Sequence, residues 1–230
     1  MQVQARATGL GPESRTRRGR KIACVFASCL AIAGLWSGVD GLTQPAIGGE
    51  PVRSLLEQRE ERVVVQKWDL SCGAAVIATV LNYQHGDPVS EREIAINLLN
   101  RKKYLDNPDA VRGQEGFSLL DMKLYVDRRG YEGIGYGDMV LEHLIDNAPI
   151  IVPVNFDGYN HFVVFRGVRG NRVLLADPAW GNRTVTLDEF EDGWIEYPQV
   201  GRVGFVVAHK DGSLPPNRLA PRPSDFVFLR

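Results

Sequence analysis

Apolar and polar positions alternate differently in the two halves of this chain. Between residues 72 and 129 the apolar residues recur at helical spacing, and turn-forming residues interrupt them. Between residues 149 and 208 the apolar runs are short and rich in Val, Ile and Phe, which is typical of strands. Helices followed by strands, without alternating β-α-β units, predict an α+β fold with a largely antiparallel sheet.

Four helices are predicted, each from a start signal. Ser71 is the expected N-cap of a mostly apolar, buried helix, Ser90 opens a capping box with Glu93, and Ser118 starts a helix that stops at Gly130. Asp138 is expected to cap the last helix. The predicted helices span residues 72–83, 90–100, 118–130 and 138–145, and residues 101–115 are predicted to form a loop.

Five short apolar runs predict the strands of the sheet. They cover residues 149–154, 161–168, 172–177, 184–187 and 202–208. Gly170-Asn171 lies between the second and third runs and is a favoured two-residue turn, so these strands are expected to form a hairpin.

The N-terminus has the pattern of an export signal. Residues 1–21 contain six Lys or Arg and one acid, and residues 22–36 carry no charge. A basic stretch followed by a short apolar core predicts a secretory signal peptide over residues 1–41. The expected location is therefore periplasmic or otherwise exported. The alternative is an uncleaved membrane anchor. Cleavage near Gly41 removes Cys24 and Cys29, and leaves Cys72 as the remaining cysteine.

Composition limits what the remaining 189 residues can do. They carry 21 basic and 26 acidic side chains, a net charge of −5, which disfavours nucleic acid as a partner. The sequence contains no phosphate-binding loop that would predict ATP binding, and no Cys/His cluster with zinc spacing. Neither a cofactor nor a metal is therefore expected. We expect an N-terminal arm over residues 42–62, one domain over 63–210 and a Pro-rich C-terminal tail over 211–230.

Cys72 is the candidate nucleophile. A structural cysteine in an oxidising compartment normally has a disulfide partner, and Cys72 has none once the signal is removed. Its place at a predicted helix N-terminus favours the thiolate, because unpaired N–H groups and the helix dipole stabilise negative charge there. We therefore expect a lowered thiol pKa and a coupled titration with a histidine base.

His161 and Asp177 are the candidate base and orienting carboxylate. They flank the predicted hairpin turn almost symmetrically, so antiparallel pairing brings them close on neighbouring strands. Acyl transfer through a thiol also needs an oxyanion donor, and the side-chain amide of Gln66 suits that role. Glutamine, cysteine, histidine and aspartate in this chain order are the arrangement of papain-like cysteine peptidases.

Three blocks of sequence resemble the C39 peptidases, the bacteriocin-processing or double-glycine peptidase family. They are Gln66-x5-Cys72-Gly-Ala-Ala, Asn160-His161-Phe-Val-Val and Asp177-Pro-Ala-Trp-Gly181, and the resemblance spans roughly residues 63–208. It implies a papain-like fold and cleavage after a Gly-Gly pair at the end of a leader peptide. It also implies Cys72 as nucleophile, His161 as base, Asp177 as orienting carboxylate and Gln66 as oxyanion donor.

The chain also departs from many members of that family. It shows no transporter membrane domain and no nucleotide-binding motif, and it resembles instead the stand-alone exported C39-like proteins, including those of functional-amyloid secretion systems. The expected substrate is thus an exported polypeptide, and a secretion system or outer-membrane exporter is the expected partner. Two alternatives stay open: a non-catalytic escort for glycine-rich segments, and a papain-like amidase or acyltransferase.

Overall fold

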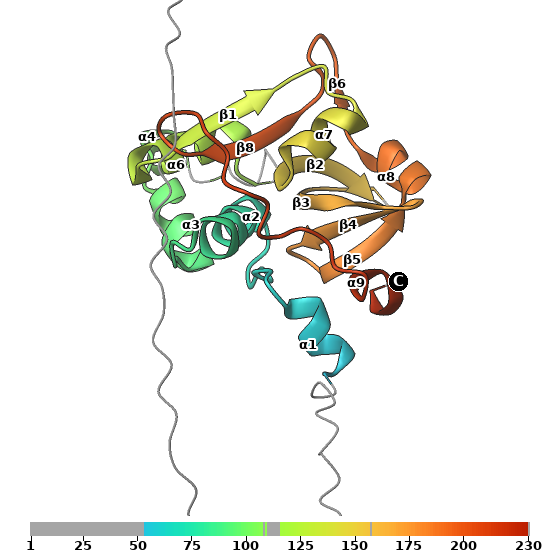
Figure 1. The fold of residues 1–230 in the computed structure, drawn as a ribbon. Helices are drawn as coiled ribbons and strands as arrows, with labels where there is room; N and C mark the ends of the chain where they lie inside the picture. Colours follow the sequence, from blue (N-terminus) through green and yellow to red (C-terminus); the bar gives the residue numbers. More distant parts are fainter. Residues whose placement is uncertain (1–52, 108, 110–115, 157, 230) are drawn as a thin grey trace, which may run out of the picture. The chain divides into compact units, whose positions relative to one another are not determined.

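The central element is a six-stranded antiparallel sheet in the order β1-β8-β2-β3-β4-β5 (Figure 1). The computed structural model describes residues 53–107, 109, 116–156 and 158–229. The sheet strands are β1 (Glu132–Tyr136), β2 (Ile150–Phe156), β3 (Tyr159–Arg169), β4 (Arg172–Asp177), β5 (Gly181–Thr186) and β8 (Gly204–Ala208). A second, two-stranded sheet pairs β6 (Glu196–Tyr197) with β7 (Gly201–Arg202).

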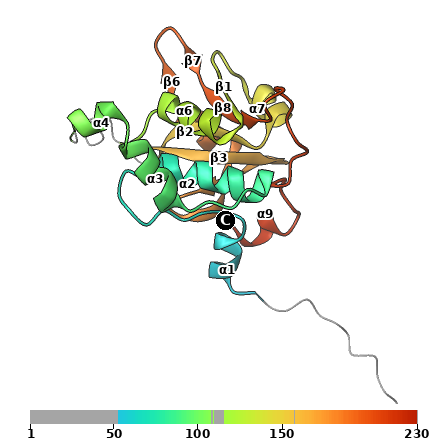
Figure 2. The same ribbon diagram turned by 90° about the vertical axis from the view of Figure 1, so that its left-hand side faces the viewer.

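Helices cover both faces of this sheet. Figure 2 shows α2 and α3 on one face and α7 on the other. The helices are α1 (Leu55–Glu60), α2 (Cys72–Thr79), α3 (Glu91–Leu99), α4 (Lys102–Asp106), α6 (Leu119–Arg129), α7 (Leu141–Asn147), α8 (Leu187–Gly193) and α9 (Asp225–Phe228). A π-helical segment, η1 (Val80–His85), continues α2 and ends at Gly86 in the left-handed conformation.

Two apolar clusters hold the layers together. The first joins α2, α3 and α6 to the sheet, with Ile77, Ile151 and Val164 among its fully buried members. The second lies on the opposite face under α7 and α8, with Val163 and Phe190 among its members. Successive strand residues point to opposite faces, so neighbouring Val163 and Val164 belong to different clusters. This fold confirms the predicted α+β class with helices on an antiparallel sheet.

Several local predictions need correction. Asp138 does not cap a helix: it has a positive φ of 49°, and α7 begins three residues later at Leu141 with Val140 in the N-cap position. Within the predicted loop 101–115, residues 102–106 form α4, while 108 and 110–115 lie outside the described residues. Strand β1 was not predicted, because its glycines make the apolar alternation weak.

The two ends of the described chain are more ordered than an arm and a tail. Within the predicted arm, residues 55–60 form α1, which begins at a Ser54 capping box, while residues 42–52 lie outside the described residues. The Pro-rich segment carries α9 near its end and is packed against the domain rather than free as a linker. Leu219 is fully buried in the first cluster, and Thr184 donates a backbone hydrogen bond to the Leu229 carbonyl.

The β3–β4 hairpin contains a β-bulge that controls which face each residue uses. Phe165 pairs with Leu175 while Gly167 pairs with Leu174, so Arg166 is the extra residue. Continuing this register sets Asp177 opposite Val163, on the face that His161 also uses. Without the bulge, Asp177 would shift to the other face and away from His161. The bulge is therefore a precondition for the candidate site.

No described helix has the length and apolar character needed to cross a membrane. The apolar segment of the predicted signal peptide, residues 22–36, lies outside the described residues.

Candidate active site

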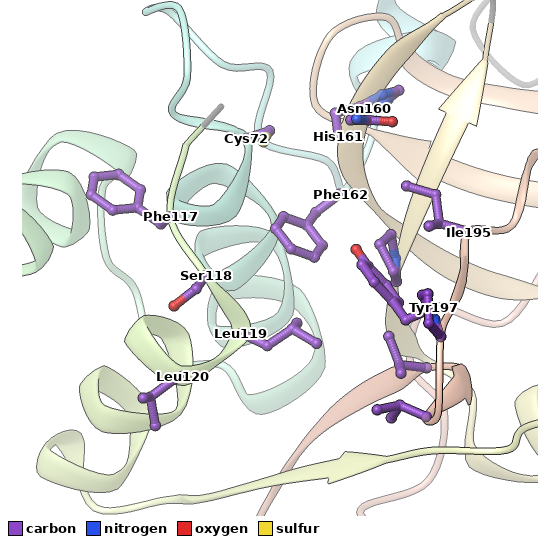
Figure 3. A pocket seen from close by; sticks show the side chains of 14 residues that line it. Cys72, Phe117, Ser118, Leu119, Leu120, Asn160, His161, Phe162, Ile195 and Tyr197 are labelled. Carbon is purple, nitrogen blue, oxygen red and sulfur yellow. The ribbon is translucent and has the colours of Figure 1, made fainter. Parts of the chain in front are cut away.

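Cys72 is the first residue of α2 and opens onto a cavity of about 660 Å³. The side chain is buried, and the residue is only 2% exposed. In Figure 3, Cys72 and His161 lie at one end of the cavity, with Leu119, Phe162 and Tyr197 further along it. The lining beyond the thiol is mostly apolar, so the cavity suits a partly apolar chain segment next to the sulfur.

The pKa of the Cys72 thiol is raised, which corrects the expected lowering. Burial is the largest cause, and the charge of Asp177 acts in the same direction. Backbone N–H groups of Phe162, Gly73 and Cys72 itself oppose the shift, as a helix N-terminus should. The sequence prediction of a helix-terminal cysteine is thus confirmed, but desolvation outweighs the stabilisation of the thiolate in this conformation.

His161 and Asp177 form the pair that the hairpin predicted. The His161 Nε2 lies 3.2 Å from Asp177 Oδ1, and both side chains are almost fully buried. Asp177 Oδ1 also accepts a hydrogen bond from the Ala179 N–H at 2.9 Å. An ionised carboxylate is acceptor-only, so His161 Nε2 must carry the proton toward it. The other nitrogen, Nδ1, is then the one left to act as a base.

Two aromatic rings fix the imidazole of His161. The Tyr159 ring stacks on it with centroids 5.1 Å apart and planes 28° apart. Phe156 meets it edge-on at 6.4 Å. The Tyr159 carbonyl oxygen lies 3.5 Å from His161 Nδ1 and can accept a hydrogen bond from it only in the imidazolium, when Nδ1 also carries a proton. Held between β2 and β3 residues, the ring has little freedom to turn away from Asp177.

Gln66 connects the loop before Cys72 to the turn after Asp177. Its backbone N–H donates to the Pro178 carbonyl at 2.8 Å, and its side-chain Nε2 donates to the Trp68 carbonyl at 3.3 Å. Burial raises the pKa of Tyr159, the nearby Cys72 adds to that shift, and the Gln66 amide opposes it. Gln66 and Cys72 therefore both lie close enough to Tyr159 to act on its pKa.

A buried glutamate supports the loop that leads into Cys72. Glu91, 4% exposed at the start of α3, accepts hydrogen bonds from the Lys67 N–H at 3.0 Å and the Ser71 Oγ at 2.5 Å. Ser71 therefore occupies the N-cap position of α2, but its side chain bonds Glu91 instead of capping the helix. A charged residue on a predicted helix start gave no sequence signal for this role.

The structure brings all four predicted residues to one end of the sheet, and adds others that sequence reasoning missed. Cys72 and His161 line one cavity, His161 and Asp177 are within hydrogen-bond distance, and the charge of Asp177 acts on the thiol pKa. Gln66 joins them through its backbone. The missed residues are Phe156, Glu91 and Arg183, whose Nε lies 3.1 Å from Asp177 Oδ2. Tyr159 stands two residues before His161, a spacing that places both on one strand face.

Among the described residues, no group of three or more His, Cys, Asp or Glu side chains is placed to hold a metal ion.

Fold and site together define a papain-like cysteine peptidase, with a helix-terminal cysteine beside a strand-borne His–Asp pair. The chain belongs to the C39 peptidase family, whose model matches residues 60–198. This confirms the resemblance found in the sequence and the expected class of enzyme, a cysteine peptidase.

Relatives and solved structures agree with that membership. The chain is 37% identical over 172 residues to the "Probable functional amyloid protease FapD" of Pseudomonas aeruginosa, covering 73% of this chain and 74% of the relative. It is 35% identical over 162 residues to the protein of that name from Pseudomonas fluorescens, covering 69% and 70%. A crystal structure of a double glycine motif protease from an AMS/PCAT transporter, in complex with the leader peptide, superimposes with a TM-score of 0.51. Its identity is 25%, and the match covers 64% of this chain and 91% of that one.

Proposed function

We propose that this chain is an exported endopeptidase that cleaves a secreted polypeptide after a Gly-Gly type site. Cys72 is the nucleophile, His161 the general base, Asp177 the orienting carboxylate and Gln66 an oxyanion donor. The observation that carries the proposal is the buried His161–Asp177 pair, 3.2 Å apart, beside the cavity into which Cys72 opens.

Each residue has one step in the proposed reaction. The Cys72 sulfur attacks the scissile carbonyl while His161 Nδ1 takes the thiol proton and then delivers it to the leaving amine. Asp177 holds Nε2–H, which fixes the tautomer that leaves Nδ1 free to act. The oxyanion is stabilised by the Cys72 backbone N–H and the Gln66 side-chain amide. Water, activated by His161, then releases the acyl group from the sulfur.

The raised thiol pKa fits an enzyme that works in an oxidising compartment. Because the thiolate is the form that oxidises, a resting thiol that stays protonated is less exposed to oxidation. Nucleophilicity then depends on proton transfer to His161 when substrate binds, and catalytic hydrogen bonds tighten in that complex.

The choice of substrate rests on the relatives. Two relatives are named as functional amyloid proteases, and one neighbouring structure is a double glycine motif protease bound to a leader peptide. A secreted polypeptide with a glycine pair at the cut, handed over by a secretion system or outer-membrane exporter, is consistent with both. The apolar cavity would take the residues beside that pair.

The test is cleavage by the full-length chain of a peptide library that contains Gly-Gly sites, with products identified by mass spectrometry. We expect cleavage by the wild type, and a loss of at least about 10³-fold in Cys72→Ala and His161→Ala. His143→Ala is the matched control, because His143 is an exposed histidine on α7 and should keep full activity.

Peptide cleavage by the Cys72→Ala variant would contradict the proposal. Stable binding of glycine-rich peptides without products would favour the escort function. Release of an amide or transfer of an acyl group, without peptide cleavage, would favour the amidase or acyltransferase function.

A further inference from the structure

The carboxylate of Asp177 divides its two oxygens between different partners. Oδ1 lies 3.2 Å from His161 Nε2 and accepts a hydrogen bond from the Ala179 N–H at 2.9 Å. Oδ2 lies 3.1 Å from Arg183 Nε, an ion pair in which neither atom has hydrogen-bond geometry, and Asp177 is fully buried. A carboxylate so thoroughly removed from water needs a cation or several donors to stay ionised. Arg183 is the cation on the side away from His161.

Arg183 is held in place on its other side as well. Its guanidinium lies over the Phe156 ring, 4.5 Å from the centroid, and that ring meets His161 edge-on. Phe156 is itself confined, because a Cβ on Gly193 would approach its ring to 2.5 Å. The Phe156 ring therefore contacts both the Arg183 guanidinium and the His161 imidazole.

We propose that Arg183 is a positioning residue of the catalytic machinery, which orients the Asp177 carboxylate toward His161 and balances its negative charge. The inference rests on the roles given to Asp177 and His161 in the proposed function. It adds a residue that the Gln, Cys, His and Asp motifs do not contain.

The physical argument concerns charge and orientation together. With Arg183 removed, Asp177 Oδ2 has no cation, so the carboxylate either rotates or carries an unbalanced charge next to two titratable groups. Those groups are His161, in direct contact, and Cys72, on which the charge of Asp177 acts. Unbalanced negative charge favours the protonated forms of both. Every pH-dependent step of the site should therefore move to higher pH.

The first experiment follows alkylation of Cys72 by iodoacetamide against pH, and needs no substrate. Full-length wild type, Arg183→Gln, Arg183→Lys and Arg172→Gln are compared, and modification is counted on the Cys72 peptide by mass spectrometry so that Cys24 and Cys29 do not contribute. Arg172 is the matched control: it lies on β4, which pairs with the β5 strand of Arg183, but it bonds Thr184, with Nε 3.0 Å from Oγ1.

We expect the Arg183→Gln profile to move up by about one pH unit, the size of effect for one charge removed at this range. Arg183→Lys should recover much of the shift, because it restores the charge without the planar fork of donors. Arg172→Gln should overlay the wild type. In an Asp177→Asn background, Arg183→Gln should shift the profile by less than it does in the wild type.

Turnover gives the second readout. On a peptide that the wild type cleaves, Arg183→Gln should lower kcat about tenfold with little change in KM, because the residue does not reach the substrate cavity. Superimposable wild-type and Arg183→Gln alkylation profiles would overturn the inference and leave the proposed function standing. A displaced profile in a chain that cleaves nothing would refute the peptidase and retain the Arg183–Asp177 coupling.

Discussion

The thiol of Cys72 lies among groups that act on its pKa in opposite directions. Backbone N–H groups at the start of α2 and at Phe162 stabilise the thiolate, while burial and the charge of Asp177 destabilise it. Burial is the largest of these effects, so the net pKa is raised. The same Asp177 that orients the base thus makes the nucleophile harder to ionise, and this conflict can be measured.

Asp177→Asn should lower the pKa of Cys72 and slow cleavage at the same time. Removing the negative charge removes one cause of the raised pKa, so alkylation of Cys72 should reach its half-maximal rate at lower pH than in the wild type. Cleavage should fall by about 10³-fold or more, because the amide carries no charge to stabilise the imidazolium and can turn its NH₂ toward Nε2, which favours the wrong tautomer. Alkylation and peptide cleavage are followed on the same preparations.

Asp188→Asn is the matched control, since Asp188 is a carboxylate in the first turn of α8. It should leave both profiles unchanged. An Asp177→Asn alkylation profile displaced to higher pH would contradict the assigned effect of the Asp177 charge on the thiol.

At the scale of elements, the β-bulge in β3 decides whether a histidine and an aspartate on neighbouring strands meet. Gly167 follows the extra residue Arg166 and has a φ of 149°, which side chains rarely adopt. A Cβ there would also approach the Pro221 ring to 2.8 Å. Backbone strain and the steric contact both tie the bulge to glycine.

Gly167→Ala should therefore lower both stability and activity. We expect a loss of about 1–3 kcal/mol in the free energy of unfolding from the strained backbone, and a further loss from the contact with Pro221. Because the bulge sets the face of Asp177, kcat should also fall in the fraction that remains folded. Denaturant unfolding and peptide cleavage at low temperature measure the two effects separately.

Gly170→Ala provides the comparison within the same hairpin. Gly170 also has a positive φ, 57°, but a Cβ there meets nothing within 4 Å. It should cost about 1 kcal/mol and leave kcat of the folded protein unchanged. If the two alanine variants lose stability and kcat equally, the bulge does not control the site.

The bulge also marks where sequence reasoning stops. Gly170-Asn171 predicted the turn and hence the pairing of β3 with β4, and Cys72 was correctly expected to start a helix. Those signals are local. A one-residue bulge leaves the apolar pattern of β3 almost intact, so near-symmetry about the turn predicted that His161 and Asp177 are close but not the register that achieves it. Arg183 could not be predicted because its contact with Asp177 depends on the pairing of β4 with β5, in which Arg183 lies opposite Leu175 on the face that Asp177 uses.

At the scale of the whole molecule, the C-terminal segment stabilises the hairpin from outside. The Leu219 carbonyl accepts a hydrogen bond from Arg166 Nε at 2.7 Å, and the Asn217 side chain donates to the Arg166 carbonyl at 3.0 Å. Arg166 is 1% exposed, and burial lowers its pKa to about 10. Further along, Arg222 makes a two-bond ion pair with Glu61, just after α1. In Figure 1 the segment runs across the domain from β8 to α9.

Proline-rich composition predicts an irregular, free segment here, and the structure adds the short helix α9 near its end. Its packing could not be predicted, because the contacts join residues about fifty to one hundred and sixty positions apart in sequence, as in Arg166 with Leu219 and Glu61 with Arg222. Backbone carbonyls supply many of them, and a carbonyl carries no sequence signal. Composition distinguishes a segment without secondary structure from a helix, but not a bound segment from a free one.

Leu219, which is fully buried, tests whether the packing of the C-terminal segment stabilises the domain. Leu219→Ala should lower the free energy of unfolding by about 2–5 kcal/mol, the usual loss for a buried leucine, and thermal inactivation should move down together with unfolding. Leu214→Ala is the matched control, since Leu214 is 40% exposed in the same segment and should change stability by no more than about 0.5 kcal/mol. Calorimetry and residual cleavage after heating are compared for both variants. If Leu219→Ala proves as stable as Leu214→Ala, the segment does not contribute to the core.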